Sequence, residues 1–136
     1  MYMAPEIEAG TPGGYQGTDI DIFAFGVMML VLRLMAYPFD NATLHDQEFK
    51  KFYEKPNSFW KNCDRNGLAS DEFKGLISLL CAPDPGARAT MADLLGHPWM
   101  RGECASKDEI VEGFTPFMNK AKQQRDGSGE ALDVDF

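Results

Sequence analysis

The sequence predicts an all-α fold, a lobe of helices around one buried central helix, followed by a partly disordered C-terminal tail. Residues 22–32 form a continuous apolar stretch that suits a core helix. In the segments after it, apolar residues recur at helical spacing, and several segments begin with a capping residue. No segment reads as a convincing β-strand, and residues 126–130 are acidic and rich in glycine and serine.

Composition restricts the class of protein. The 136 residues are 44% hydrophobic, which is enough for one ordinary domain with a core. The net charge of −8 argues against nucleic acid or an anionic membrane as the main partner. It fits basic peptides or proteins better, although acidic surfaces also serve solubility.

The cysteines and histidines do not form a metal-binding pattern. Cys63, Cys81 and Cys104 are widely spaced, and His45 and His97 do not complete a ligand set with them. We therefore expect reduced thiols and no metal site. No secretory signal pattern occurs, so the sequence predicts an intracellular protein of the cytoplasm or nucleus.

The central helix is predicted from residue 18 to about residue 35. A membrane-spanning helix needs about 20 apolar residues, and the apolar stretch ends at Arg33. Because this helix is apolar on all sides, we expect it to be buried on all sides. Thr18 is the predicted N-cap and Pro38 ends the helix. Residues 8–18 before it are rich in glycine, threonine and proline, which predicts a surface loop.

A second helix is predicted within residues 44–53, where Phe49, Phe52 and Tyr53 recur at helical spacing. These aromatic side chains either pack in the core, which is the favoured interpretation, or present a docking surface for protein partners. After this helix we expect a turn at residues 55–58, two aromatic residues that hold a loop on the core at 59–60, and a loop at 62–67.

Capping patterns predict the later helices. Ser70 precedes the apolar stripe Phe73, Leu76, Ile77 and Leu80. Thr90 and Asp93 form a capping box before a last core helix that carries Met91, Leu94 and Leu95.

The chain after residue 100 changes in character. Ser106 and Glu109 form another capping box, which predicts a short amphipathic helix. Pro116 is expected to interrupt that helix, with a second short piece after it. The segment at 126–130 is expected to be disordered.

Five short motifs are informative through their order and spacing. They are Tyr2-Met3-Ala4-Pro5-Glu6, Asp21-Ile22-Phe23-Ala24-Phe25-Gly26-Val27, Tyr37-Pro38-Phe39, Asp84-Pro85-x-x-Arg88 and His97-Pro98-Trp99. Together they resemble the C-terminal lobe of a eukaryotic Ser/Thr protein kinase from the Ala-Pro-Glu motif onward, especially the calcium/calmodulin-dependent-kinase-like group. The resemblance implies a partial protein kinase domain at residues 1–100 and a C-terminal extension at 101–136.

The resemblance implies structural roles for three charged residues. Glu6 and Arg88 would form a buried ion pair, since a planar guanidinium can hold a carboxylate with two hydrogen bonds. The alternative is two unrelated surface charges. Asp21 would accept backbone hydrogen bonds from a catalytic loop, and the alternative is an ordinary aspartate at a helix start, a role that Asp19 fills equally well.

The segment before Glu6 would line the pocket beside the phosphoacceptor of the substrate, and the alternative is a generic loop. Its residues are Tyr2, Met3, Ala4 and Pro5.

The motifs of phosphoryl transfer do not occur in the sequence. There is no Gly-x-Gly-x-x-Gly loop, strand lysine motif, His-Arg-Asp or Asp-Phe-Gly. We therefore expect no catalytic, cofactor-binding or metal-binding residue here, and no activity of this chain alone. The complete parent enzyme would use ATP and magnesium to phosphorylate serine or threonine. Expected partners are a protein or peptide substrate and a missing N-terminal kinase half. The alternative is a non-catalytic protein-interaction module derived from a kinase lobe.

Overall fold

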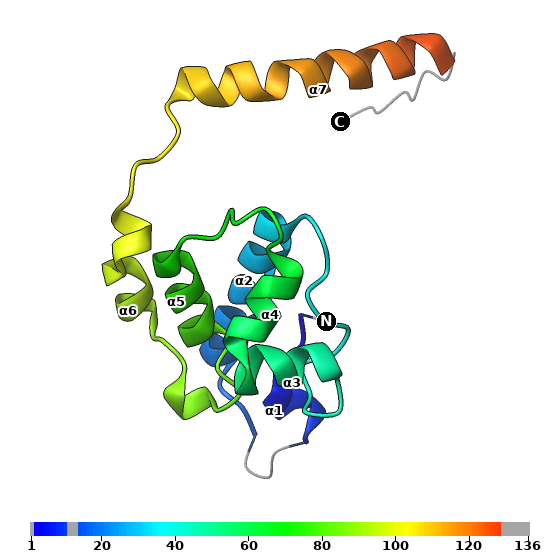
Figure 1. The fold of residues 1–136 in the computed structure, drawn as a ribbon. Coiled ribbons are helices and arrows are strands. Elements are labelled where there is room, and N and C mark those ends of the chain that lie inside the picture. The colour runs from blue at the N-terminus through cyan, green and yellow to red at the C-terminus, as the bar shows by residue number, and fades with distance from the viewer. Residues whose placement is uncertain (1, 11–13, 129–136) are drawn as a thin grey trace. The chain divides into compact units, whose positions relative to one another are not determined.

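The chain folds into helices joined by loops (Figure 1). A computed structural model describes residues 2–10 and 14–128, and no β-strand occurs among them. The all-α prediction is confirmed. The α-helices are α1 (Pro5–Glu8), α2 (Gly17–Leu34), α3 (Gln47–Glu54), α4 (Pro56–Cys63), α5 (Asp71–Leu80), α6 (Met91–Gly96) and α7 (Lys107–Ser128), with 3-10 turns η1 (Pro85–Ala87) and η2 (Pro98–Arg101). The chain divides into two compact units, Met1–Gly102 and Glu103–Phe136.

Helix α2 is the central helix of the first unit and packs against α5 (Figure 1). Its inner side chains Phe23, Val27 and Leu30 are completely buried. Gly26 permits the close crossing, because a Cβ on this residue would lie 2.7 Å from the Cβ of Leu80 in α5. The predicted core helix is therefore present, with a glycine at its tightest contact.

The opposite face of α2 is not covered, so the prediction of burial on all sides is wrong. Met28 and Leu32 are 41% and 65% exposed. An apolar helix with neighbours on one side only leaves apolar side chains in contact with water. The ends also differ slightly, since α2 begins one residue before the predicted cap Thr18, and Met35 follows its last turn in a left-handed conformation with φ of 52°. None of the described helices is both long and apolar enough to cross a membrane.

Helices α3 and α4 follow each other with a single linking residue, so the predicted turn at residues 55–58 is wrong. Pro56 occupies the first position of α4, where its missing N–H would have no helical partner in any case. Asp46 caps α3, because its carboxylate accepts hydrogen bonds from the backbone N–H groups of Glu48 and Phe49, both at 2.9 Å. Local capping thus forms two helices where one was predicted.

A chain of aromatic side chains joins α3 and α4 to α5 and η2. Neighbouring ring centroids lie 5.0 to 6.4 Å apart along the series Phe39, Phe49, Phe52, Phe59, Trp60, Phe73 and Trp99. Such tilted and edge-to-face pairs are favourable. Phe49 and Phe52 are buried, as the core-packing interpretation requires, whereas Tyr53 is 58% exposed.

The predicted caps of α5 and α6 are confirmed. Ser70 accepts a hydrogen bond from the third backbone N–H of α5, and Thr90 begins a reciprocal capping box. The core prediction for α6 is wrong at two of three positions, since Leu94 is buried but Met91 and Leu95 are 57% and 62% exposed. Helix α6 therefore turns much of its apolar surface outward.

The second unit contains α7, which is continuous across the predicted break. Ser106 and Glu109 form the expected capping box, with hydrogen bonds of 2.8 and 3.2 Å between each backbone N–H and the other side chain. Pro116 lies inside the helix, so the prediction of two short pieces is wrong. A proline removes one helical hydrogen bond, and here the helix continues past it. Helix α7 extends to Ser128, so the prediction of disorder over residues 126–130 is wrong at residues 126–128. The remainder of that segment, with residues 129–136, lies outside the described part of the chain.

Candidate functional site

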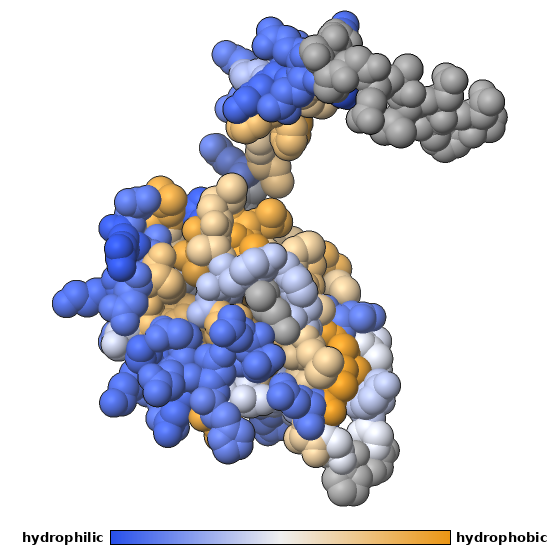
Figure 2. All heavy atoms as spheres, turned by 90° about the vertical axis from the view of Figure 1, so that its right-hand side faces the viewer, coloured by the Kyte–Doolittle hydropathy of each residue, from blue (hydrophilic) through white to orange (hydrophobic). Residues whose placement is uncertain are grey.

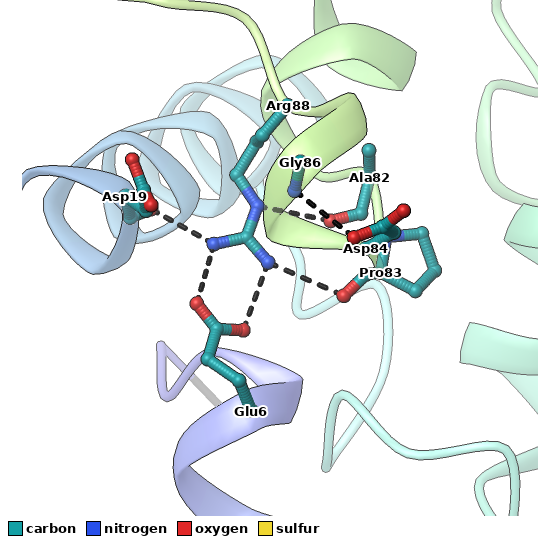
Figure 3. Close-up of polar contacts among 7 residues, drawn as sticks. All are labelled: Glu6, Asp19, Ala82, Pro83, Asp84, Gly86 and Arg88. Atoms are coloured by element: carbon teal, nitrogen blue, oxygen red, sulfur yellow. Dashed lines mark hydrogen bonds and ion pairs between the residues drawn. The ribbon is translucent and has the colours of Figure 1, made fainter. Parts of the chain in front are cut away.

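Glu6 and Arg88, which are 82 residues apart in sequence, meet inside the first unit (Figure 3). Nη1 of Arg88 donates to Oε1 of Glu6 at 2.7 Å, and Nη2 donates to Oε2 at 2.8 Å. Both residues are buried, with 8% and 7% of their surfaces exposed. Two parallel charge-assisted hydrogen bonds are a strong arrangement for these groups. The pair connects α1 to the loop after α5.

The guanidinium of Arg88 also binds three backbone carbonyl groups (Figure 3). Nε donates to Ala82 at 2.9 Å, Nη1 to Asp19 at 2.9 Å, and Nη2 to Pro83 at 3.4 Å. Its central carbon lies 5.1 Å from the ring centroid of Phe23, within cation–π range. Arg88 therefore links α1, the first turn of α2 and the loop after α5. A lysine, with all its donors on one nitrogen, could not make these contacts together.

A tight turn directs Arg88 into the interior. The carboxylate of Asp84 accepts a hydrogen bond from the backbone N–H of Gly86 at 2.9 Å, and a proline begins η1 between them. After the turn, the N–H of Ala89 donates to the carbonyl of Leu79 in α5 at 3.1 Å. The Asp-Pro-x-x-Arg sequence thus specifies both the turn and the side chain that the turn orients.

The ion pair keeps the Glu6 carboxyl ionised. Hydrogen bonding from Arg88 holds the pKa of Glu6 below its ordinary value of 4.5, while burial acts in the opposite direction. The carboxylate is therefore charged at neutral pH, and its charge depends on the guanidinium beside it.

Asp21 lies apart from this pair. Its side chain is exposed, and none of the hydrogen bonds between described residues involves its carboxylate. Asp21 and Asp19 line a hollow of about 790 Å³ between α2 and α6, which we call the α2–α6 hollow. Its apolar walls are formed by Ile22, Phe25, Met91, Leu94, Leu95 and Met100. The α2–α6 hollow is therefore lined by apolar side chains and by the carboxylates of Asp19 and Asp21.

The α2–α6 hollow does not suit ATP and magnesium. Its lining contains Asp19 and Asp21 but no lysine or arginine, so a triphosphate would meet like charge. Phosphate sites instead use cations and converging backbone N–H groups. Within residues 2–10 and 14–128, no group of three or more His, Cys, Asp or Glu side chains gathers as metal ligands would.

The predicted substrate segment leads directly into α1. Ala4 is completely buried, whereas Tyr2 and Met3 are 45% and 50% exposed. Pro5 occupies the start of α1, immediately before the paired Glu6. The segment is thus anchored at Ala4 and presents two side chains to solvent, and its contact with a substrate stays a prediction.

Two residues that organise this region were not predicted. Asp19 contributes through its backbone carbonyl, which accepts a hydrogen bond from Arg88. Any residue type could provide this carbonyl, so the sequence does not indicate the contact. Asp46 fixes the loop before α3, and its position three residues before the first buried aromatic is a capping signal that would have identified it. Its carboxylate accepts the backbone N–H groups of Asp40, Asn41, Glu48 and Phe49.

Comparison with protein families gives a match over residues 1–100 to the protein kinase domain. The chain belongs to the protein kinase family. The resemblance to the C-terminal lobe of a kinase is thereby confirmed, and the Glu6–Arg88 pair lies within the matched part of the kinase domain.

Curated relatives of this kinase chain carry kinase names, and several of these names specify a serine/threonine or a calcium/calmodulin-dependent protein kinase. The probable serine/threonine-protein kinase pXi of Dictyostelium discoideum is 37% identical over 110 residues, which cover 81% of this chain and 14% of that protein. Calcium/calmodulin-dependent protein kinase type 1 of Caenorhabditis elegans is 32% identical over 128 residues, covering 91% and 34%. Protein kinase kin1 of Schizosaccharomyces pombe is 33% identical over 102 residues, covering 73% and 10%. The chain spans about a tenth to a third of the length of these relatives.

Proposed function

We propose that this chain is the substrate-side part of a Ser/Thr protein kinase, which transfers the γ-phosphoryl group of ATP to a serine or threonine hydroxyl of a protein. Family membership supports a kinase, and the names of its relatives support the Ser/Thr class. The observation that carries the proposal is the buried Glu6–Arg88 pair, because it fixes the predicted substrate segment to the helices beneath it.

The contribution of this chain is to position the substrate. Ala4 is buried and Glu6 is held by two hydrogen bonds, so the backbone from Tyr2 to Pro5 has a defined place. A substrate peptide bound along it would present its hydroxyl in a fixed orientation, which is a large part of the catalysis of bimolecular reactions. ATP, magnesium and the residues that bind them belong, in this proposal, to an N-terminal kinase half.

The α2–α6 hollow is the surface on which we place that half. Met91 and Leu95 are more than half exposed there, and the uncovered face of α2 adds further apolar surface. Figure 2 shows one face of the molecule, on which hydrophobic patches interrupt a largely hydrophilic surface. Burying apolar surface contributes about 25 cal/mol per Å², which favours docking. Asp21 at the hollow offers a carboxylate to backbone N–H groups of the docked half.

Complementation tests this proposal. The chain is mixed with the separately purified N-terminal kinase half of the C. elegans relative, and transfer of labelled phosphate from ATP to a serine peptide is measured. We expect activity only when both parts are present. Leu95→Asp in the hollow should abolish it, whereas Leu68→Asp, at a similarly exposed leucine outside the hollow, should not. Equal activity of the two variants would refute the docking surface, and inactivity of the unmodified pair would refute the proposed function.

The alternative is a non-catalytic interaction module. Such a module would bind partners through the aromatic helix and the C-terminal tail. In α3, Phe49 and Phe52 are buried and Tyr53 is exposed. In the tail, α7 exposes Val111 and Phe114. ATP and magnesium added to the chain alone should leave its Tm unchanged, since a ligand raises Tm only by binding the folded state. A monodisperse monomer that melts cooperatively and does not associate with the N-terminal half would favour the interaction module.

A further inference from the structure

A second hollowed surface lies beside α1, away from the residues of the α2–α6 hollow. A hollow of about 520 Å³ and another of about 250 Å³ share Glu8 and Ala42 in their linings. Leu44, Phe49 and Pro83 wall the larger one. Because the two hollows share these residues, they are neighbours, and we call the pair the Glu8 groove. Its smaller part reaches Met3 and its larger part reaches Pro5, both in the predicted substrate segment.

The walls of the Glu8 groove are held in place by contacts within the first unit. Pro5 precedes Glu6, whose carboxylate is bound by Arg88, and the carbonyl of Pro83 accepts from the same guanidinium at 3.4 Å. On the other side, the Asp46 carboxylate fixes the loop that carries Ala42 and Leu44 by accepting backbone N–H groups at both of the loop's ends. A groove with preorganised walls binds a ligand at a lower ordering cost.

Glu8 gives this groove its charge. Its side chain is exposed, and none of the ion pairs between described residues includes it. The linings of the two hollows contain no lysine or arginine, and His45 is their other titratable residue. In a chain with a net charge of −8, a basic side chain entering the groove would meet a carboxylate and no permanent positive charge.

We propose that the Glu8 groove is a docking site for an extended segment of the protein substrate that lies outside the phosphoacceptor and carries one apolar and one basic side chain. This inference rests on the proposed function. The apolar side chain occupies the larger hollow against Leu44 and Pro83, and the lysine or arginine pairs with Glu8. In an extended peptide, side chains two residues apart point to the same side about 7 Å from each other, so one short segment reaches both positions.

Peptide binding to the whole chain tests the docking site directly. The probes are fluorescein-labelled heptapeptides of glycine that contain leucine and arginine two residues apart, in either order, and counterparts with glutamate in place of arginine. Fluorescence anisotropy should show tighter binding of an arginine peptide. Glu8→Gln should weaken that binding by about two- to fivefold, the range of exposed ion pairs. Glu103→Gln removes the same charge outside the groove and should leave the affinity unchanged.

The apolar half of the groove has its own test. Leu44→Asn should weaken binding of the arginine and glutamate peptides alike, because both peptides carry the leucine that would contact Leu44. Leu44 is 56% exposed, so its replacement should leave the fold intact. Leu68→Asn, at a leucine that is 51% exposed and outside the groove, is the matched control. The docking site is refuted if neither arginine peptide binds saturably, or if Glu8→Gln and Glu103→Gln have equal effects.

These outcomes separate the docking site from the proposed function, because peptide binding requires no phosphoryl transfer. A reconstituted kinase that phosphorylates a serine peptide, together with equal binding of the arginine and glutamate peptides to the chain, would overturn the docking site alone. Selective peptide binding by a chain that no kinase half activates would overturn the proposed function alone.

Discussion

Replacing Arg88 with methionine tests the central contact of this lobe. Methionine keeps an unbranched apolar side chain in place of the arginine stem, but the variant leaves the Glu6 carboxylate buried without the guanidinium. Breaking a buried ion pair in this way costs about 3–5 kcal/mol of unfolding free energy. The upper part of the range is expected, because the carbonyl groups of Ala82 and Asp19 also lose the donor that binds them at 2.9 Å.

The loss of unfolding free energy in Arg88→Met should also depend on pH, which gives a second way to test it. The pKa of Glu6 is lowered in the folded protein, so its contribution to stability is present above its ordinary value of 4.5 and is lost as pH falls through the folded value. In Arg88→Met, burial without the guanidinium raises the pKa of Glu6 instead. The difference in unfolding free energy between the two proteins should therefore be largest near pH 7. It should narrow as pH falls, first through the raised pKa of Glu6 in the variant and then through the lowered pKa in the unmodified protein.

Urea unfolding followed by tryptophan fluorescence and circular dichroism measures this difference. Arg65→Met is the matched control, because Arg65 is exposed and its loss should change the unfolding free energy by less than about 0.5 kcal/mol. The double variant with Glu6→Gln should cost less than the sum of the single changes, with a coupling of about 1 kcal/mol or more. A cost for Arg88→Met below about 1 kcal/mol, or a coupling of zero, would refute the reasoning.

Three further outcomes follow from local geometry. Gly26→Ala should lower the unfolding free energy by about 1–3 kcal/mol in urea unfolding, because the added Cβ would lie 2.7 Å from atoms of Leu80 and Cys81. Gly75→Ala, whose added Cβ would have nothing within 4 Å, should stabilise α5. Equal effects of the two substitutions would refute this account. Ser70→Ala should cost about 1 kcal/mol through loss of the N-cap, and an unchanged urea midpoint would contradict that cap. With a thiol reagent at pH 8, exposed Cys104 should react quickly and Cys81 should react only after unfolding, since burial raises the pKa of Cys81 to about 12. Fast labelling of all three cysteines in the folded chain would contradict the burial of Cys81.

Features set by local chemistry could be predicted from the sequence. The capping residues Ser70 and Thr90 start helices because a side-chain oxygen meets the N–H groups of the next turn, and that requirement is visible in four residues. The Glu6–Arg88 contact could be predicted from the sequence for a different reason. Its partners are far apart, but the motifs around them are specific enough in order and spacing to indicate a known family of folds.

Proline shows where local patterns stop being sufficient. Pro56 was predicted to form a turn and begins α4, and Pro116 was predicted to interrupt a helix and lies within α7. The residue type is the same, and the outcome depends on where the helix begins relative to the proline. That register is fixed by neighbouring caps and packing, which the proline itself does not encode.

Burial is the feature that the sequence could not determine at this site. Leu94 and Leu95 are adjacent and chemically identical, but one is buried and the other is 62% exposed. The residue type shows that a leucine side chain favours burial, but it does not show whether another segment of the same chain packs over that side chain. The exposed leucine lines the α2–α6 hollow, where we propose that an N-terminal half docks. The exposure of an apolar residue that was predicted as core supports this proposal, because exposed apolar patches are common at surfaces that bind partners.

The two proposed surfaces depend on a single side chain. Arg88 holds Glu6, which precedes Glu8 by two residues in α1, and it also binds the carbonyl of Asp19, which lines the α2–α6 hollow. The same guanidinium binds the carbonyl of Pro83 in the wall of the Glu8 groove. A displacement of the Arg88 side chain would therefore disturb the proposed docking of a kinase half and of a substrate segment together. An apolar pair of similar volume could fill the space at the junction of α1, α2 and the loop after α5, but it could not bind the three carbonyl groups that Arg88 binds.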